Sequence, residues 1–296
     1  MPKRGDDAVR TTNVLVAGAG GRLGRLLTEE LQRRGARVRA LVRRAPAVPL
    51  ADGVEVRIAD VRTDAALPQL CRGIDVVFSS VGASVSPSPF AGFRTYTRVD
   101  APANLRLLEA ARAAGVSRFV YTSLNGGAES RRLDYAEGHE RVVDALRASP
   151  LAATVLRPTG FFAAMGDLVT MARRGAVPVF GDGNARTNPI DERDLAAIAA
   201  DEVMATGSGC REVAAGGPEE FSRREIAELA FAVLGKRPRL LPVPVWLAKT
   251  LACGLRCVNP RAGHFLAFAA HVMTHPCLAP RLGTRRLVDA LRARAQ

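Results

Sequence analysis

Short apolar runs alternate with helical patterns through the first half of the chain. Apolar, β-branched runs of the kind that form buried strands occupy residues 13–17, 37–43, 54–59, 75–81, 118–122 and 153–157. The stretches between them that have helical spacing are residues 22–35, 63–71, 96–114 and 135–148. This alternation predicts a doubly wound α/β fold, in which a parallel sheet carries helices on both faces. Ligands of such sheets bind beyond the carboxyl ends of the strands.

The pattern changes after residue 158. Helical patterns follow at 161–174, 191–205 and 222–234, with strands at 212–215 and 240–243, a turn-rich stretch at 175–189 and three further helical patterns. Ser222 is positioned to cap the helix that starts there. No low-complexity linker separates the two halves. We therefore expect one compact unit with a sheet domain at 11–158, a smaller, mostly helical lobe at 159–296, and a cleft between them.

A glycine-rich turn joins the first strand to the first helix. Gly18, Gly21 and Gly24 follow the spacing GxxGxxG, Gly20 lies within the turn, and Leu23 occupies the position where the last glycine of GxGxxG would fall. Glycines at such a turn let the backbone approach a pyrophosphate, and the helix N-terminus offers unpaired N–H groups to the anion. The order of strand, turn and helix predicts a dinucleotide phosphate cradle, with a ligand-free glycine turn as the alternative.

Composition narrows the class of protein. The 296 residues are 48% hydrophobic, and the net charge of +13 comes almost wholly from arginine. The basic residues are not interleaved with aromatic residues, so no nucleic-acid partner is predicted. The first ten residues lack a signal-peptide core and no apolar stretch is long enough to span a membrane, so we expect a cytoplasmic protein.

The five cysteines are scattered and have no histidine at a fixed offset. We therefore predict buried free thiols and no metal site or disulfide framework.

Four stretches carry a family resemblance. They are residues 18–24 (GAGGRLG), 105–124 (LRLLEAARAAGVSRFVYTSL), 156–162 (LRPTGFF) and 180–196 (FGDGNARTNPIDERDLA). Together they resemble the short-chain dehydrogenase/reductase superfamily, most of all its atypical branch near the nitrogen-repression-regulator-like and complex I accessory-subunit-like groups. The resemblance covers essentially the whole chain. It implies a Rossmann-type doubly wound parallel sheet with a small C-terminal substrate lobe, and an NAD(P) cofactor.

Arginines at the end of the second strand bear on the choice of cofactor. An acid there would bind the adenosine ribose and repel a 2′-phosphate, whereas this chain has Arg43 and Arg44, with Arg22 in the glycine turn. Guanidinium groups bind phosphate well, so NADP(H) is favoured over NAD(H). The alternative is that these are ordinary surface arginines.

The resemblance also implies roles for residues that follow later strands. It places Asp60 and Val61 at the adenine, Ser80, Val81 and Gly82 along the adenosine ribose, and Pro158, Gly160 and Phe161 against the nicotinamide.

The catalytic residues of the family are a serine, a tyrosine, and a lysine four residues after the tyrosine. Here Ser123 and Tyr135 match the first two, but His139 replaces the lysine, and the chain has no lysine between Lys3 and Lys236. A neutral histidine can still bind a ribose hydroxyl, but it lowers the pKa of a tyrosine far less than a lysine does. The alternatives are that Ser123 only ends its strand and that Tyr135 is an ordinary residue of an amphipathic helix. Tyr121 is predicted to face the core.

The predicted cleft is apolar. We expect it to be lined by residues 83–93, 161–165 and 181–189 and by the C-terminal helices, with Arg186 and Asn188 as polar groups and Phe90, Phe93, Phe162, Met165 and Trp246 as apolar ones. Such a pocket suits a small hydrophobic carbonyl or quinone-like substrate. The segments 242–258 and 261–273 could contact a membrane surface peripherally, although helices of this kind more often cover the cofactor domain.

Two hypotheses follow. The first is an NAD(P)H-dependent oxidoreductase that transfers a hydride to such a substrate. The alternative is a non-catalytic NAD(P)-binding redox sensor or accessory subunit, which the YxxxH motif favours. A nucleotide-sugar epimerase or dehydratase is a weaker third option, because those enzymes generally keep YxxxK. The oligomeric state stays open.

Overall fold

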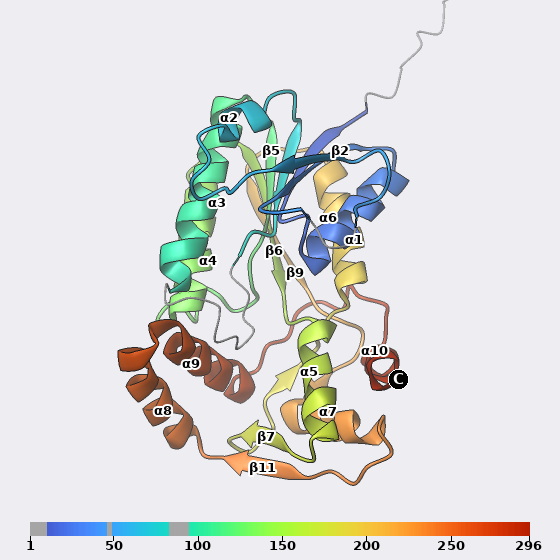
Figure 1. Cartoon of the computed structure of the whole chain (residues 1–296), viewed down its shortest axis with the longest axis vertical. Coiled ribbons are helices and arrows are strands. Elements are labelled where there is room, and N and C mark those ends of the chain that lie inside the picture. The colour runs from blue at the N-terminus through green and yellow to red at the C-terminus, as the bar shows by residue number, and fades with distance from the viewer. Residues whose placement is uncertain (1–10, 46–48, 83–94) are drawn as a thin grey trace, which may run out of the picture.

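A parallel sheet forms the centre of the computed structural model, which describes residues 11–45, 49–82 and 95–296 (Figure 1). Its seven strands run in the order β3-β2-β1-β4-β5-β6-β9, and every neighbouring pair is parallel. The predicted doubly wound fold of the Rossmann type is confirmed. The strands are β1 (Asn13–Ala17), β2 (Arg37–Val42), β3 (Glu55–Ile58), β4 (Val76–Ser79), β5 (Arg118–Thr122), β6 (Ala152–Pro158) and β9 (Cys210–Ala215).

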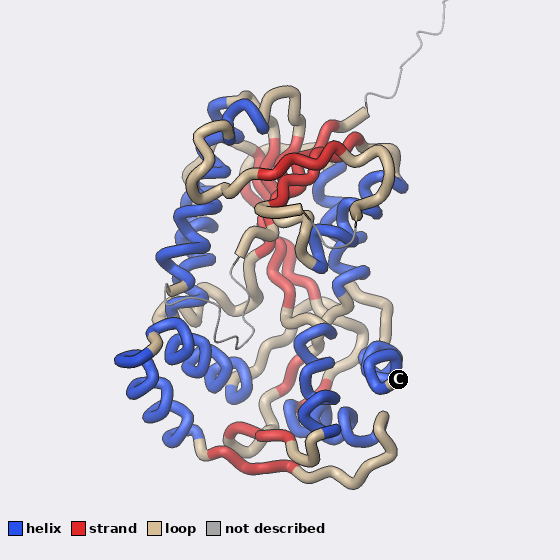
Figure 2. The backbone as a smooth tube through the Cα atoms, in the orientation of Figure 1, coloured by secondary structure: helices blue, strands red, loops and turns tan. Residues whose placement is uncertain are grey.

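Helices cover both faces of this sheet (Figures 1 and 2). Alternate residues of β1 point to opposite faces, so that Leu15 packs in the core beneath α3 and α4, and Val14 packs in the core beneath α1 and α6. All residues of β4 and β5 are buried, which explains why these strands are continuous apolar runs. The helices of this part are α1 (Arg22–Arg33), α2 (Leu67–Leu70), α3 (Tyr96–Ala113), α4 (Asp134–Arg147) and α6 (Glu192–Met204).

The division of the chain differs from the boundary predicted at residue 158. The strand β9 pairs with β6 along its whole length, and α6 shares a core with α1. Both elements therefore belong to the sheet domain, although they follow residue 158. The chain leaves the sheet after β6, forms part of the lobe, and returns to the sheet before it completes the lobe.

The lobe is built around a third core, which is formed by α5, α7 and α10. The turn-rich stretch at 175–189 contains two strands that the sequence did not predict. They pair with strands distant in the chain, β7 with β11 and β8 with β10, so local sequence carries little sign of them. Ser222 caps α7 and forms a capping box with Glu225, as its position predicts. The elements are α5 (Phe162–Arg173), β7 (Val177–Phe180), β8 (Arg186–Thr187), β10 (Phe221–Ser222), α7 (Arg223–Ala232), β11 (Leu240–Val243) and α10 (Leu287–Ala295).

Two further helices, α8 (Val245–Val258) and α9 (Pro260–Thr274), form a hairpin at the edge of the lobe (Figure 1). Gly263 lets them approach closely, since a Cβ there would lie 2.6 Å from the backbone nitrogen of Arg256. It is α9 that packs on α4, while α8 packs on α9. The expectation that both helices cover the cofactor domain is therefore wrong for α8. Within the described ranges, no helix has the length and apolar character needed to cross a membrane.

Candidate functional site

The glycine turn after β1 is held by backbone hydrogen bonds. Gly18 N donates to Leu41 O (3.2 Å), and Gly21 N donates to Gly18 O (2.9 Å). Gly18 has a φ of +87°, and a Cβ there would lie 2.9 Å from Ser80 Oγ. A Cβ on Gly24 would overlap the carbonyl oxygen of Gly18. These two positions therefore require glycine, and the turn keeps the shape of a phosphate cradle.

The first turn of α1 is left open for an anion. Its N-cap is Gly21, which provides no side-chain cap, and the first turn carries no acidic residue. Leu23 is buried in the core beneath α1, so its side chain stays clear of the turn. The Arg22 guanidinium lies 3.3 Å from the Glu192 carboxylate while its side chain remains 59% exposed. Arg22 thus has an acidic protein partner.

The carboxyl ends of β2 and β3 carry the residues predicted to contact adenosine. Arg43 and Arg44 are exposed directly after β2. Hydrogen bonds from Arg62, with a smaller contribution from the charge of Arg43, lower the pKa of Asp60 to about 2. Val61 is buried in the core. Arg43 and Arg44 are therefore the open cations at this edge, whereas the Asp60 carboxylate already binds Arg62.

After β4 the chain stays close to the glycine turn. Ser80 N donates to Ala17 O (3.1 Å), and the side chain of Asn104 donates to Val81 O (2.9 Å). This places Ser80, Val81 and Gly82 at the carboxyl edge of the sheet beside β1. The predicted cleft loop at 83–93, with Phe90 and Phe93, lies outside the described residues.

Three buried polar atoms at the end of β5 and on α4 have no hydrogen-bond partner among the residues described. They are Thr122 Oγ1, Ser123 Oγ and His139 Nε2. Burying such an atom without a partner costs about 1–3 kcal/mol, so a group of three at the carboxyl edge points to a ligand. The orphaned atoms and the glycine turn together fit a dinucleotide that lies across this edge.

His139 is fixed by a tyrosine of the neighbouring strand. Its Nδ1 lies 2.7 Å from the hydroxyl oxygen of Tyr121, and both residues are buried. Burial raises the pKa of Tyr121, so its hydroxyl keeps its hydrogen and can donate a hydrogen bond to Nδ1. Burial, aided by the charge of Arg157, lowers the pKa of His139 to about 4. The imidazole is therefore neutral near pH 7. When Nδ1 accepts from Tyr121, the imidazole hydrogen lies on Nε2, which has no partner among the described residues.

Tyr135 lies in an aromatic cluster at the start of α4. Its ring is 4.8 Å from that of His139, 5.0 Å from that of Tyr96 and 4.5 Å from that of Phe268 on α9. Burial raises the pKa of its phenol. Tyr135 and His139 thus lie together as the YxxxH spacing predicts, but no positive charge on His139 lowers the pKa of the tyrosine.

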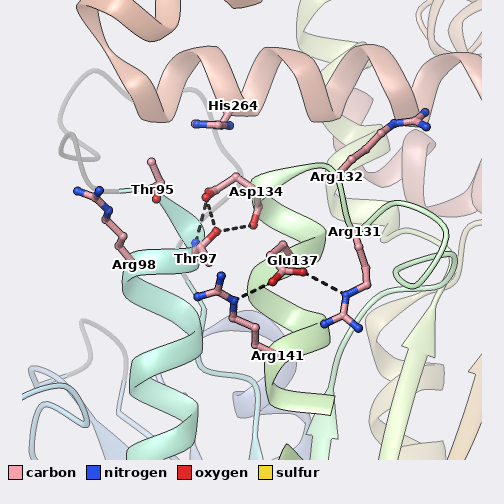
Figure 3. A pocket seen from close by; sticks show the side chains of 9 residues that line it. All are labelled: Thr95, Thr97, Arg98, Arg131, Arg132, Asp134, Glu137, Arg141 and His264. Atoms are coloured by element: carbon pink, nitrogen blue, oxygen red, sulfur yellow. Dashed lines mark hydrogen bonds and ion pairs between the residues drawn. The ribbon is translucent and has the colours of Figure 1, made fainter. Parts of the chain in front are cut away.

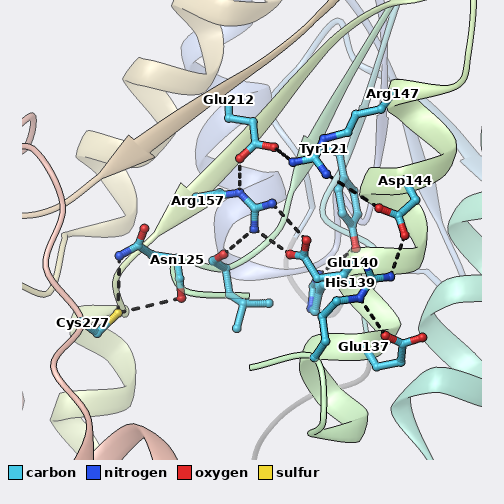
Figure 4. Close-up of polar contacts among 12 residues, drawn as sticks. Tyr121, Asn125, Glu137, His139, Glu140, Asp144, Arg147, Arg157, Glu212 and Cys277 are labelled. Atoms are coloured by element: carbon cyan, nitrogen blue, oxygen red, sulfur yellow. Dashed lines mark hydrogen bonds and ion pairs between the residues drawn. The ribbon is translucent and has the colours of Figure 1, made fainter. Parts of the chain in front are cut away.

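A buried ion pair that sequence reasoning missed stands behind His139 (Figure 4). Arg157 on β6 binds Glu140 (Nη1 to Oε1, 2.7 Å) and Glu212 (Nε to Oε2, 2.6 Å), and donates to Leu124 O (3.0 Å). It ties α4, β9 and the segment after β5 together. The available sequence signal was an arginine at the end of an otherwise apolar strand, next to Pro158.

Two residues predicted to line the cleft instead belong to the protein interior. Asn188 is 1% exposed, and its side chain donates to Ala279 O (2.8 Å) and Gly217 O (3.2 Å). Phe162 is 3% exposed in the lobe core. Phe161 is half-buried against the core beneath α1 and α6, and its backbone forms a β-bridge with Ile190. Arg186 is exposed beside Glu220.

The hollow shown in Figure 3, of about 410 Å³, lies at the start of α3 and α4 beneath α9. Its carboxylates already have partners, since Glu137 binds Arg131 (3.1 Å) and Arg141 (2.8 Å), and Asp134 accepts from Tyr96 N (2.7 Å). This charged lining differs from the apolar pocket that the sequence predicts.

The five cysteines are free, as predicted. Cys253 and Cys257 are nevertheless exposed on α8, so the expectation of burial is wrong for these two. Among the described residues, no group of histidine, cysteine and acidic side chains could hold a metal ion.

Comparison with known proteins adds to this geometry. A family model described as NAD(P)H-binding matches residues 18–205. The chain belongs to this NAD(P)H-binding family, within the atypical short-chain dehydrogenase/reductases. A divinyl chlorophyllide a 8-vinyl-reductase of Oryza sativa subsp. indica is 32% identical in an alignment 259 positions long, which covers 79% of this chain and 62% of the plant protein. This chain thus spans less than two thirds of that relative.

A ceramide reductase of Caulobacter vibrioides is 32% identical over 78% of this chain and 73% of its own. Among solved structures, a Citrobacter triphenylmethane reductase complexed with NADP(H) has a TM-score of 0.76 at 21% identity, covering 95% of this chain and 99% of the other. An NADPH-dependent quinone oxidoreductase of Escherichia coli has a TM-score of 0.72 at 22% identity, with the same coverage. At this identity the two structures show the shared fold.

Proposed function

We propose that the protein is an NADPH-dependent oxidoreductase that reduces a small hydrophobic substrate. The observation that carries the proposal is the group of buried, unpartnered atoms of Thr122, Ser123 and His139 at the carboxyl edge. His139 lies beside Tyr135, with 4.8 Å between their ring centroids, and Thr122 and Ser123 follow β5 at the same carboxyl edge as the glycine turn, which supports a reaction site at the nicotinamide end. The reductase names of relatives across the family add support.

In this proposal the glycine turn and the N-terminus of α1 hold the pyrophosphate of the cofactor. Arg43 and Arg44 bind a 2′-phosphate, which favours NADPH over NADH. His139 donates from Nε2 to a ribose hydroxyl, and Pro158, Gly160 and Phe161 form the wall beside the nicotinamide. When bound, the cofactor supplies the hydride.

Proton delivery falls to Tyr135, with Ser123 Oγ as the hydrogen-bond donor to the substrate oxygen. Burial keeps the Tyr135 phenol protonated near pH 7, which suits a reaction that consumes a proton. The reverse oxidation needs a phenolate, and neutral His139 does little to stabilise one. The arrangement therefore favours reduction over alcohol oxidation.

The surroundings support an apolar substrate. Phe268 packs on Tyr135, and Phe161, which is half-buried, lies in the segment after β6. A hydrophobic carbonyl or a quinone fits such a site. The relatives named for ceramide and divinyl chlorophyllide also take hydrophobic compounds, which agrees with this class.

A second candidate is a non-catalytic NAD(P)-binding sensor or accessory subunit. The neutral imidazole at the lysine position favours this second candidate. A neutral imidazole can bind the cofactor ribose, but it does not stabilise the phenolate that proton transfer by Tyr135 produces.

One paired experiment separates the two functions. Calorimetric titration with NADPH and NADH measures affinity, and NADPH oxidation is followed by absorbance with a set of quinones and aromatic ketones. Tight NADPH binding with oxidation by at least one compound supports the oxidoreductase. Binding without oxidation by any of them favours the sensor, and failure to bind either cofactor contradicts both.

A further inference from the structure

A second group of buried polar atoms without partners lies in the lobe, at the start of α7. Arg223 is 6% exposed, and its Nε and Nη2 atoms have no hydrogen-bond partner among the described residues. Thr187 on β8 is fully buried, and its Oγ1 also lacks a partner there.

The charge of Arg223 is not balanced by a carboxylate. Burial lowers the pKa of Arg223, and within the described chain the group that opposes this shift is the thiol of Cys277. An arginine nevertheless stays charged near pH 7. A buried cation is costly unless an anion pairs with it, so this guanidinium points to an anionic ligand.

Strand pairing places Arg223 and Thr187 on one face. Phe221 on β10 lies directly opposite Thr187, so the two side chains share a face. Side chains alternate along an extended chain, and Ser222 is extended (φ −75°, ψ 160°), so Arg223 returns to the face of Phe221. Cys277 forms a β-bridge with Thr187 and therefore belongs to the same face.

This face is turned toward the carboxyl edge of the central sheet. Cys277 Sγ lies 3.4 Å from Thr159 O, after β6, and 3.7 Å from Asn125 Nδ2, after β5 (Figure 4). Asn125 follows Ser123 by two residues, and Thr159 is next to Pro158 at the predicted nicotinamide wall. The face that carries Arg223 therefore borders the candidate reaction site from the side of the lobe.

The unpartnered edge of Arg223 indicates the chemistry of the ligand. Nε and Nη2 lie on the same edge of the planar guanidinium, and their N–H bonds are parallel. This edge matches the two oxygens of a carboxylate in a bidentate pair. Within the described chain, no other arginine or lysine acts on the pKa of Arg223. One cation balances the single charge of a carboxylate better than the nearly two charges of a phosphate.

We propose that Arg223 binds a carboxylate group of the substrate, with the Thr187 hydroxyl as an additional donor, so that the enzyme reduces hydrophobic ketones or quinones that also carry a carboxylate. Phe221 on the same face suits the apolar part of such a compound. This substrate class rests on the proposed function, whereas the carboxylate site itself does not depend on hydride transfer.

Calorimetry with three probes tests the site on the full-length protein in the presence of NADPH. Octanoate supplies a carboxylate on an apolar chain, octanamide the same chain without charge, and octyl phosphate the chain with a phosphate. We expect octanoate to bind at least about tenfold more tightly than the other two. Equal binding of octanoate and octanamide would overturn the anion site, and tighter binding of octyl phosphate would overturn the assignment of a carboxylate.

A pair of matched variants locates the contact. Arg223→Met removes the cation, keeps a long side chain and should weaken octanoate binding by at least about tenfold. Arg224→Met removes the next arginine of α7, which is exposed and donates from Nη2 to Asp182 O (3.0 Å), and should bind octanoate like the wild type. Equal loss in both variants would show an effect of general charge and contradict the proposal.

Thermal denaturation distinguishes ligand binding from a structural role of Arg223. Without an anion, a buried unpaired cation destabilises the fold, so Arg223→Met should have a Tm equal to or above that of the wild type. Octanoate should raise the Tm of the wild type and of Arg224→Met, but not that of Arg223→Met. A Tm of Arg223→Met far below that of the wild type, or a failure of this variant to fold, would overturn the proposal.

Kinetics separate this proposal from the proposed function. Acetophenone and 4-acetylbenzoate differ by one carboxylate, and we expect about tenfold higher kcat/KM for 4-acetylbenzoate, a preference that Arg223→Met abolishes. Reduction of neutral ketones without octanoate binding would overturn the carboxylate site and leave the reductase intact. Octanoate binding through Arg223 without NADPH oxidation by any compound would support the site and count against the reductase.

Discussion

The two ends of the candidate cofactor site are built by different means. At the phosphate end, the backbone forms the candidate site, because Gly18 and Gly24 leave no space for a Cβ and the first turn of α1 has no side-chain cap. At the nicotinamide end, side chains form the candidate site, and the hydrogen bond with Tyr121 orients His139. The first kind of site is encoded within a few consecutive residues. The second requires partners that the fold brings together.

The difference has a chemical consequence. The phosphate end keeps the family pattern, with Leu23 accommodated in the core. The nicotinamide end has exchanged a charged lysine for a neutral imidazole, and the nearby cation, Arg157, is already paired with Glu140 and Glu212. The phosphate-binding part of the candidate site thus keeps the family pattern. In the proposed mechanism, Tyr135 acts without a cation at the position where the family has its lysine.

The largest expected effect is at the reacting end. Tyr135→Phe removes the proposed proton donor and should lower kcat for NADPH-dependent reduction by roughly 100-fold or more, with NADPH affinity unchanged. Steady-state kinetics and calorimetry measure the two quantities. Tyr96→Phe is the matched control, since its ring packs on Tyr135 and it has no proposed catalytic role. A kcat that Tyr135→Phe leaves intact would remove the tyrosine from the mechanism.

The next effect is at the phosphate end. Gly24→Ala places a Cβ on the Gly18 carbonyl and should lower the free energy of unfolding by about 2–3 kcal/mol, as overpacking does. A Cβ on Gly20 would lie 3.6 Å from the Val42 side chain, an ordinary contact, so Gly20→Ala should change stability by less than about 0.5 kcal/mol. Urea denaturation compares the two. Equal stability of both variants would show that the turn is not limited by this contact.

The free energy of unfolding at acid pH tests the protonation state of His139. Its pKa is about 4 in the folded protein against 6.5 ordinarily, so the unfolded chain binds the proton first as the pH falls. Its contribution to stability is present above pH 6.5 and is lost as the pH falls toward 4. Between about pH 7 and about pH 5 the loss should be about 2 kcal/mol. His139→Gln should lack this part of the loss in denaturation curves.

His271, whose pKa burial and the charge of His275 lower to about 4, titrates in both the wild type and the His139 variant. The difference between the two proteins therefore isolates His139. Parallel pH dependence in both would contradict a neutral His139.

The smallest effect concerns the choice of cofactor. Arg43→Gln with Arg44→Gln should weaken NADPH binding by about tenfold and leave NADH binding unchanged, because only NADPH carries the 2′-phosphate. Arg37→Gln, an exposed arginine at the opposite end of β2, is the control. Calorimetry with both cofactors measures the ratio. Equal loss for NADPH and NADH would argue against 2′-phosphate recognition.

Sequence patterns predicted the central sheet well, because each buried parallel strand is an apolar run that can be recognised from its own residues alone. They missed β7 and β8, whose partners β11 and β10 lie far along the chain. They also treated Asn188 as a polar group of the cleft, although the segments after β9 and α9 bind its side chain. The four-residue spacing from Tyr135 predicts that His139 lies at the site. Its hydrogen bond with Tyr121, on which the position of the imidazole hydrogen depends, joins α4 to β5 and could not be predicted from local sequence.

We propose that a neutral His139, held by Tyr121 and carrying its hydrogen on Nε2, stands where the family has a charged lysine. An NMR titration of the protein labelled with ¹⁵N in its four histidines tests this most directly, with His139→Gln to assign the signal. We expect the His139 nitrogens to show the neutral form with Nε2–H from about pH 7 down to about pH 5. A protonated imidazolium at pH 7, or a hydrogen on Nδ1, would contradict it.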